Sequence, residues 1–227
     1  MNREFAFTLA EVLVTLGIIG VVSAMTIPSL TQSWQKQAYV TQLKKVYSQL
    51  SQAASYTIQK EQVMSLDESK YSYNDANAPS NFLKDNFKIV QDCGHSYTPC
   101  FAARYRNING DTMGLYRPEV AVTTADGYAL AILENRYGHP GFSSTGGGDW
   151  HGEMIFEIDI NGAKGPNVSG RDLFHLELYS DGTATEIYDI KNAHKEDLAD
   201  PSYCKEDTQY GLGCLTSIIN NGWTMDY

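Results

Sequence analysis

Apolar residues dominate the start of the chain, where AFTLAEVLVTLGIIGVVSAMTIPSL (residues 6–30) carries a single charge, at Glu11. As a helix, the run from Phe7 to Pro28 would be about 33 Å long, at about 1.5 Å per residue. The hydrocarbon layer of a membrane is about 30 Å thick. The pattern therefore predicts a helix that can span a membrane.

Beyond Pro28 the chain becomes more polar, yet its apolar residues still recur at steps of three and four. This spacing places them on one face of a helix, with polar residues opposite. Because proline removes one backbone donor, we expect Pro28 to bend the helix without necessarily ending it. One long helix from residue 8 to about 60 is the prediction. Its second half carries the apolar stripe Tyr39, Leu43, Val46, Tyr47, Leu50, Ala54 and Ile58.

Later segments alternate apolar and polar residues with the period of two that is typical of strands. They follow a polar stretch, residues 65–80, that we interpret as a loop. Aspartate-glycine pairs between alternating segments are a strong hairpin signal. The expected strands are residues 120–125, 128–133, 154–160, 174–179 and 185–190, with turns at Asp126-Gly127 and Asp181-Gly182.

Strands with one apolar and one polar face predict an antiparallel sheet with one solvated side. Glu157, Asp159, His175 and Glu177 fall on the side expected to face water. The apolar side would pack on the amphipathic helix. The predicted fold class is therefore α+β, with a long N-terminal helix packed on an antiparallel β-sheet head.

The charge balance argues against one class of partner. The chain holds 17 basic and 27 acidic residues, a net charge of -10, which repels phosphate backbones. Its 15 tyrosines are not interleaved with basic residues, as stacked nucleotides would require. We therefore expect no nucleic-acid binding.

The four cysteines, Cys93, Cys100, Cys204 and Cys214, form two pairs that are close in sequence. Their spacings match none of the short metal-ligand spacings such as C-x2-C, which favours disulfides. Bridges within each pair are the most economical of the three possible connectivities, and four reduced, buried thiols are the alternative. Disulfides require an oxidising compartment, which a membrane segment would give access to.

Glu11 needs an explanation, because an ionised carboxylate is costly in hydrocarbon. One interpretation of the segment is a secretory signal peptide with Val22-Ser23-Ala24 as its cleavage site, and a second is an ordinary membrane anchor. Neither interpretation explains the carboxylate. In a third, a peptidase cuts between Ala6 and Phe7, and Glu11 pairs with the new terminal amine of a neighbouring subunit.

Residues 7–16, FTLAEVLVTL, resemble the N-terminal signature of type IV pilins and type II secretion pseudopilins. In that family a prepilin peptidase cuts before the phenylalanine and methylates its amine, and the acidic residue five along guides subunit docking. Gly20 and Pro28 also fall where the family has a glycine and a helix-bending proline. One departure is Ala6, because the family normally has glycine just before the cut.

The resemblance implies how the chain is divided into segments and where in the cell it is located. Residues 1–6 would be the leader, 7–28 the transmembrane and assembly helix, 29–62 its amphipathic continuation and 63–227 the globular head. The subunit would wait in a bacterial inner membrane with its head in the periplasm, and then join a periplasmic or cell-surface filament. Its partners would be copies of itself or related subunits, a prepilin peptidase and an inner-membrane assembly platform.

The resemblance extends to two further regions. The segment joining the strands at 154–160 and 174–179 is similar to a loop of pilin-like proteins, and some pseudopilins hold calcium in such a loop. Its candidate Ca²⁺ ligands are Asp159, Asn161, Asn167 and Asp172, although the register of an EF-hand is missing. Cys204 and Cys214 would bracket the C-terminal disulfide-closed region of the family.

Nothing in the sequence arranges residues for catalysis, and no other cofactor is expected. His139, His151, His175 and His194 lack metal-ligand spacing and are interpreted as surface or turn residues, and Gly146-Gly147-Gly148 lacks the G-K-[ST] of a phosphate loop. The sequence therefore predicts a structural filament subunit and no enzyme. The alternative is a membrane-anchored or secreted periplasmic binding module whose head binds a metal or a sugar.

Overall fold

The structure is a computed structural model, and it describes residues 8–135, 153–186, 204 and 212–227. The chain divides into two compact units, Met1–Ala38 and Tyr39–Tyr227. The boundary falls inside the first helix, α1, which runs without interruption from Leu9 to Glu61. The second unit, which we call the head, contains the sheet and the remaining helices.

The part of α1 that belongs to the head buries one stripe of side chains and exposes the other. The stripe follows the three-and-four spacing of the sequence, as expected for an amphipathic helix. Pro28 lies inside α1 and does not end it, which confirms the prediction of one continuous helix. The buried residues are Val40, Leu43, Val46, Leu50, Ala53, Ala54 and Thr57.

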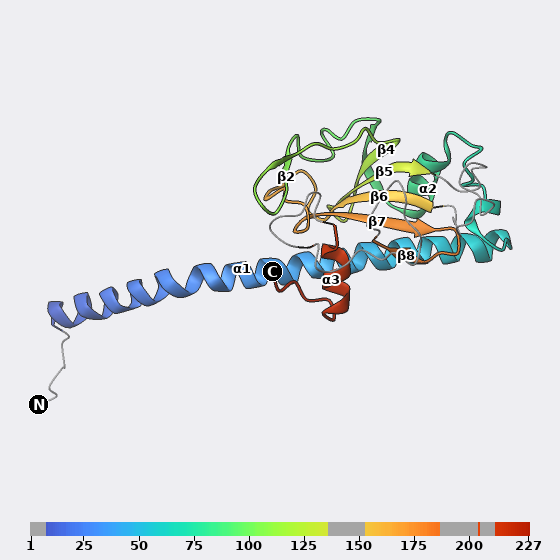
Figure 1. Cartoon of the computed structure of the whole chain (residues 1–227). Coiled ribbons are helices and arrows are strands. Elements are labelled where there is room, and N and C mark those ends of the chain that lie inside the picture. The colour runs from blue at the N-terminus through green and yellow to red at the C-terminus, as the bar shows by residue number, and fades with distance from the viewer. Residues whose placement is uncertain (1–7, 136–152, 187–203, 205–211) are drawn as a thin grey trace, which may run out of the picture. The chain divides into compact units, whose positions relative to one another are not determined.

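The head is built on an antiparallel sheet of six strands in the order β1-β4-β5-β6-β7-β8 (Figure 1). A two-stranded ribbon, β2-β3, forms a second sheet. The fold is therefore α+β and pilin-like, as predicted. The strands are β1 (Ile89–Gly94), β2 (Tyr105–Arg106), β3 (Thr112–Met113), β4 (Val120–Thr124), β5 (Ala129–Asn135), β6 (Glu153–Asp159), β7 (Leu173–Tyr179) and β8 (Ala184–Thr185).

Both aspartate-glycine hairpins occur where the sequence predicts them. At the first, Thr124 and Tyr128 close the turn by a backbone hydrogen bond of 2.9 Å, and Gly127 adopts a positive φ of 90°. At the second, Gly182 has a φ of 85° between β7 and β8. Only glycine takes this conformation without steric cost, so the turn residues fix the register of the strands.

One face of the sheet forms the main core with α1. Val122, Leu130, Phe156 and Leu176, from the four central strands, share a single hydrophobic cluster with the buried stripe of the helix. Figure 1 shows this part of α1 running along the sheet. Each fully buried side chain of this size stabilises the fold by about 1.5 to 3 kcal/mol relative to exposure.

The prediction that the opposite face of the sheet is solvated is wrong. Glu157 and Asp159 on β6 and His175 and Glu177 on β7 are all buried, with at most 8% of their surface exposed. The cover consists of a second cluster, in which Cys100, Phe101, Ala102, Tyr105 and Met113 pack on Ala121, Ala129, Ala131 and Leu173. The polar alternation of β6 and β7 therefore marks a buried polar layer.

Several short elements were not predicted. The expected loop at residues 65–80 contains the 3-10 helix η1 (Leu66–Glu68) and the start of α2 (Ala78–Asn86), which has proline in its first turn. The edge strand β1 and the C-terminal helix α3 (Cys214–Asn220) were also missed. Of the strand expected at 185–190, the structure shows the start as β8, which ends at Thr185. Residues 187–190 lie outside the described residues.

Candidate functional site

The first part of α1 exposes a continuous set of large apolar side chains. Leu9, Leu13, Leu16, Ile19 and Val22 are each more than half exposed. An 18-residue window of the helix reaches a mean hydropathy of 2.0, with none of it buried. By length and composition this is the one helix of the described residues that can cross a membrane. Exposed apolar surface of this extent requires lipid or other protein chains to cover it.

Four hydroxyl groups in and just beyond this segment are satisfied within the helix. Thr15 donates to the Val12 carbonyl at 3.0 Å, and Thr26 donates to the Val22 carbonyl at 3.0 Å. Ser29 and Thr31 make equivalent bonds to carbonyls three and four residues earlier. In hydrocarbon, polar groups need internal partners, so these bonds suit the segment to a water-free environment.

Glu11 closes a capping box at the N-terminus of α1. Its Oε2 accepts a 2.8 Å bond from the Thr8 backbone N–H and a 2.7 Å bond from the Thr8 hydroxyl. The Glu11 N–H donates back to Thr8 Oγ1 at 3.2 Å. A threonine followed three residues later by a glutamate is the sequence form of this cap. Thr8 is not among the predicted site residues, although its position three residues before Glu11 is visible in the sequence.

The second oxygen of the carboxylate, Glu11 Oε1, accepts no hydrogen bond from the described part of the chain. The predicted processing junction, Ala6 and Phe7, and the predicted leader lie outside the described residues. The structure thus places Glu11 in the first turn of the helix, where its charge also complements the helix dipole.

Residues 1–27 match a family model described as the prokaryotic N-terminal methylation motif. The chain carries a prepilin signature. No curated protein and no solved structure matches the chain. The signature and the apolar helix support a pilin-like or pseudopilin subunit, in a family of structural proteins, and suggest membrane anchoring.

In this pilin-like chain the cysteines pair locally. Cys93 bonds to Cys100 and Cys204 bonds to Cys214, the economical pairing favoured by their spacing. The first bridge closes a loop over the polar face of the sheet. The second lies against Gly170, where an added Cβ would come within 2.5 Å of Cys214 Sγ.

The loop predicted to bind calcium brings its four candidate ligands together but uses most of their oxygens internally. Asp172 accepts backbone N–H bonds from Asn167 at 2.7 Å and Val168 at 2.6 Å, and Asp159 accepts bonds from Tyr105 and from the Asn161 N–H. Of the oxygens of these four side chains, Asn161 Oδ1 and Asn167 Oδ1 are buried without a partner among the described residues.

Calcium takes six to eight oxygen ligands, so the four candidate side chains would have to be joined by further oxygens from the backbone or from water. No cluster of three or more His, Cys, Asp or Glu residues that could hold a metal occurs in the described ranges. Calcium binding stays a prediction, and titration of the full chain with Ca²⁺ in a calorimeter tests it.

The buried polar layer is the feature that sequence reasoning missed most completely. The Tyr97 hydroxyl donates to Glu157, and the Tyr105 hydroxyl donates to Asp159. Burial raises the pKa of Glu157 to about 7 and that of Asp159 to about 8, because the charged carboxylates lose their hydration. The layer is therefore partly protonated near neutral pH.

His175 belongs to the same layer, which corrects its interpretation as a surface or turn residue. It is the cross-strand partner of Glu157, with 3.7 Å between Nδ1 and Glu157 Oε1, too long for a hydrogen bond. Burial lowers the pKa of His175 to about 4. His139, His151 and His194 and the triple glycine lie outside the described residues.

Proposed function

We propose that this chain is a structural subunit of a type IV pilus or a type II secretion-like filament. A prepilin peptidase removes residues 1–6 by cutting between Ala6 and Phe7, and an inner-membrane assembly platform adds the processed subunit to the filament. Until then the apolar part of α1 anchors the subunit in the bacterial inner membrane, with the head in the periplasm. The observation that carries the proposal is a lone carboxylate, Glu11, at the start of an exposed apolar helix bearing the methylation motif.

The capping box suggests that the two oxygens of the Glu11 carboxylate have different roles. One oxygen is held by Thr8, and the other, Oε1, is directed to no partner among the described residues. The terminal amine released at Phe7 of an adjacent subunit is the complementary group. Pairing these charges offsets the cost of keeping each in an apolar filament core.

Apolar side chains of α1 supply most of the cohesion between subunits, because association removes their exposed surface from lipid or water and packs it closely. Other copies of the chain or related pilin-like subunits are the partners. The proposal assigns no reaction to the chain.

Mass spectrometry of the N-terminus tests the processing step. The full chain is expressed with and without a prepilin peptidase, and we expect a mature chain beginning at Phe7, with one additional methyl group, only when the peptidase is present. A chain beginning at Met25 would instead identify a signal peptide, and an intact Met1 in the presence of the peptidase would identify a plain anchor.

A pair of substitutions at Glu11 tests the docking step. Glu11→Val should leave membrane insertion intact and lower the incorporation of the chain into filaments by roughly tenfold or more, measured as the sheared, sedimentable fraction. Glu11→Gln keeps acceptor oxygen for Thr8 but removes the charge. If the charge pair matters, both variants fail alike, and wild-type incorporation of Glu11→Gln would leave only the helix cap as its role.

A further inference from the structure

A small pocket lies in the head where the end of α1 meets α2. Its volume is about 140 Å³, and its walls come from three segments of the chain. At about 30 Å³ per water molecule, this is room for roughly five waters or one small ring. The lining residues are Tyr56, Thr57, Lys60, Glu61, Lys70, Tyr71, Asp85 and Asn86.

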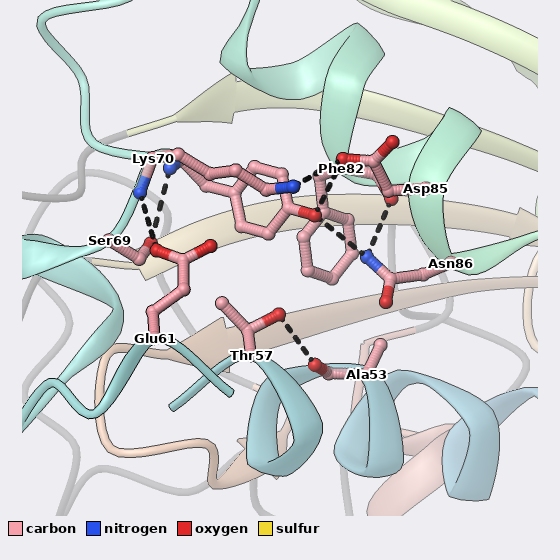
Figure 2. A network of polar contacts seen from close by, with 9 residues as sticks. Ala53, Thr57, Glu61, Ser69, Lys70, Phe82, Asp85 and Asn86 are labelled. Atoms are coloured by element: carbon pink, nitrogen blue, oxygen red, sulfur yellow. Dashed lines mark hydrogen bonds and ion pairs between the residues drawn. The ribbon is translucent and has the colours of Figure 1, made fainter. Parts of the chain in front are cut away.

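Hydrogen bonds between neighbouring segments hold the walls of the pocket in place. Lys70 Nζ pairs with Asp85 Oδ2 at 2.7 Å, and the Tyr71 hydroxyl donates to the same oxygen at 3.0 Å (Figure 2). On the α1 side, Glu61 Oε2 accepts the Lys70 backbone N–H at 3.0 Å. The site is thus formed before any ligand arrives, so binding would cost little ordering of side chains.

Several polar groups of the pocket keep bonding capacity. Asp85 Oδ1, Glu61 Oε1 and Asn86 Oδ1 accept no hydrogen bond from the described residues. In the same part of the chain, the Lys60 ammonium bonds to no carboxylate and lies 5.2 Å from the centre of the Tyr56 ring. The pocket therefore offers three acceptors and one donor that a ligand can use.

The charges that line this pocket favour neither an anion nor a cation. Two lysines, Lys60 and Lys70, face two carboxylates, Glu61 and Asp85, so the lining has no net charge. An anion would approach both carboxylates, and a cation would approach both ammonium groups. The net charge of the whole chain, -10, disfavours anions further.

The pocket also has an aromatic edge. Tyr56 exposes 56% of its surface, and although the Lys60 ammonium lies over its ring, the exposed part of the ring offers an apolar platform beside the acceptors. A neutral ligand that carries several hydroxyl donors on one side and C–H groups on a ring face matches this combination. We propose that the pocket between α1 and α2 binds one neutral monosaccharide unit, either free or as part of a glycan. This inference does not depend on filament assembly.

Saturation-transfer NMR of the full chain tests the proposal, in micelles of a detergent without a sugar headgroup. The neutral probes are D-glucose, D-galactose, D-mannose and N-acetyl-D-glucosamine, and the charged probes are D-glucuronate and D-glucosamine. We expect at least one neutral sugar to bind in the millimolar range and more tightly than either charged sugar. Methyl glycosides and disaccharides of that sugar then distinguish a glycan residue from a free sugar.

Substitutions assign the binding to this pocket. Tyr56→Ala removes the platform and should weaken binding roughly tenfold, whereas Tyr116→Ala, at a tyrosine of similar exposure outside the lining, should leave it unchanged. Lys60→Met should shift binding toward D-glucosamine, because the lining becomes negative. Circular dichroism confirms that each variant is folded.

Three results would overturn the proposal. The first is the absence of binding by all four neutral sugars. The second is unchanged binding in folded Tyr56→Ala, and the third is tighter binding of a charged sugar by the unmodified chain.

Discussion

Two regions of this molecule place a carboxylate in apolar surroundings, and they satisfy it in different ways. Glu157 lies in the folded head, where the Tyr97 hydroxyl donates to it and burial raises its pKa to about 7. Glu11 starts an exposed apolar helix and has one oxygen held by Thr8 and the other without a described partner.

The two carboxylates differ in the role we assign to them: Glu157 is a structural residue of the head, and Glu11 is proposed to guide assembly. Inside the head, the Tyr97 hydroxyl donates to Glu157 Oε2, Oε1 accepts no hydrogen bond from the described residues, and the carboxyl can become neutral by taking up a proton. At the helix start, the proposed docking role requires the charge to persist until a second chain neutralises it. An oxygen without a partner in its own chain is therefore not enough to indicate function, and the difference lies in whether the charge can be lost by protonation or has to persist.

The largest expected effect is the response of the head to pH. Glu157, Asp159 and Glu186 have folded-state pKa values raised by burial to about 7, 8 and 8, so the folded chain keeps protons that the unfolded chain releases. Stability is therefore lost as the pH rises from the unfolded-state pKa values near 4 to these folded-state values, and on the order of 3 kcal/mol of this loss falls between pH 6.5 and 8. Denaturant unfolding of the full chain in micelles, followed by tryptophan fluorescence at each pH, measures the free energy of unfolding.

His175 acts in the opposite direction, and only below about pH 6.5. Its folded-state pKa is lowered to about 4, so its contribution is lost as the pH falls from about 6.5. Above pH 6.5 only the acids matter. Between pH 6.5 and 8, Glu157→Gln should lose about 1 kcal/mol less stability than the wild-type chain, because the amide cannot ionise. Equal pH slopes for variant and wild type would contradict the assignment.

A smaller effect is expected when the loop that carries Tyr97 loses its bridge. Cys93 and Cys100 are separated by seven positions, and Tyr97 lies between them. Replacing both with serine should cost about 2.5 kcal/mol of unfolding free energy in the chain-entropy model. A loss below about 0.5 kcal/mol in the same unfolding assay would show that packing of Phe101 and Tyr105, and not the bridge, holds the cover in place.

The smallest effect concerns the helix start. Thr8→Ala removes the hydroxyl of the capping box and should destabilise the first turn of α1 by about 1 kcal/mol. Hydrogen exchange of the amides of residues 9–12 should become faster, whereas Thr8→Ser should preserve protection. Unchanged exchange in Thr8→Ala would mean that the cap does not stabilise this turn.

The sequence predicts the parts of this fold that repeat a pattern over many residues. The long helix follows from apolar spacing, and the β4-β5 hairpin follows from alternation around Asp126-Gly127. Strands of two residues, such as β2 and β3, are too short to show a period. The helix α2 was missed because its polar residues resemble a loop, although Pro79 is suited to a first helical turn.

Some residues of the candidate site can likewise be predicted from the sequence, and others cannot. Glu11 is recognisable because it interrupts a uniform apolar run, and Thr8 follows from the capping pattern. The burial of Glu157 is not predictable, because its donor, Tyr97, comes from a distant segment without periodic pattern. Local alternation shows which side chains share a face of a sheet, but tertiary packing decides whether water reaches that face.

The closure of the second face of the sheet limits how the head can recognise other molecules. In the described strands β5, β6 and β7, neither the aliphatic side under α1 nor the acid side under the disulfide loop offers a broad flat surface to a partner. Contacts with neighbouring subunits or with the environment are therefore left to the perimeter of the domain, where its turns, helix ends and strand edges meet solvent. Substitutions at this perimeter can change which molecules the head contacts without disturbing the buried acids Glu157 and Asp159.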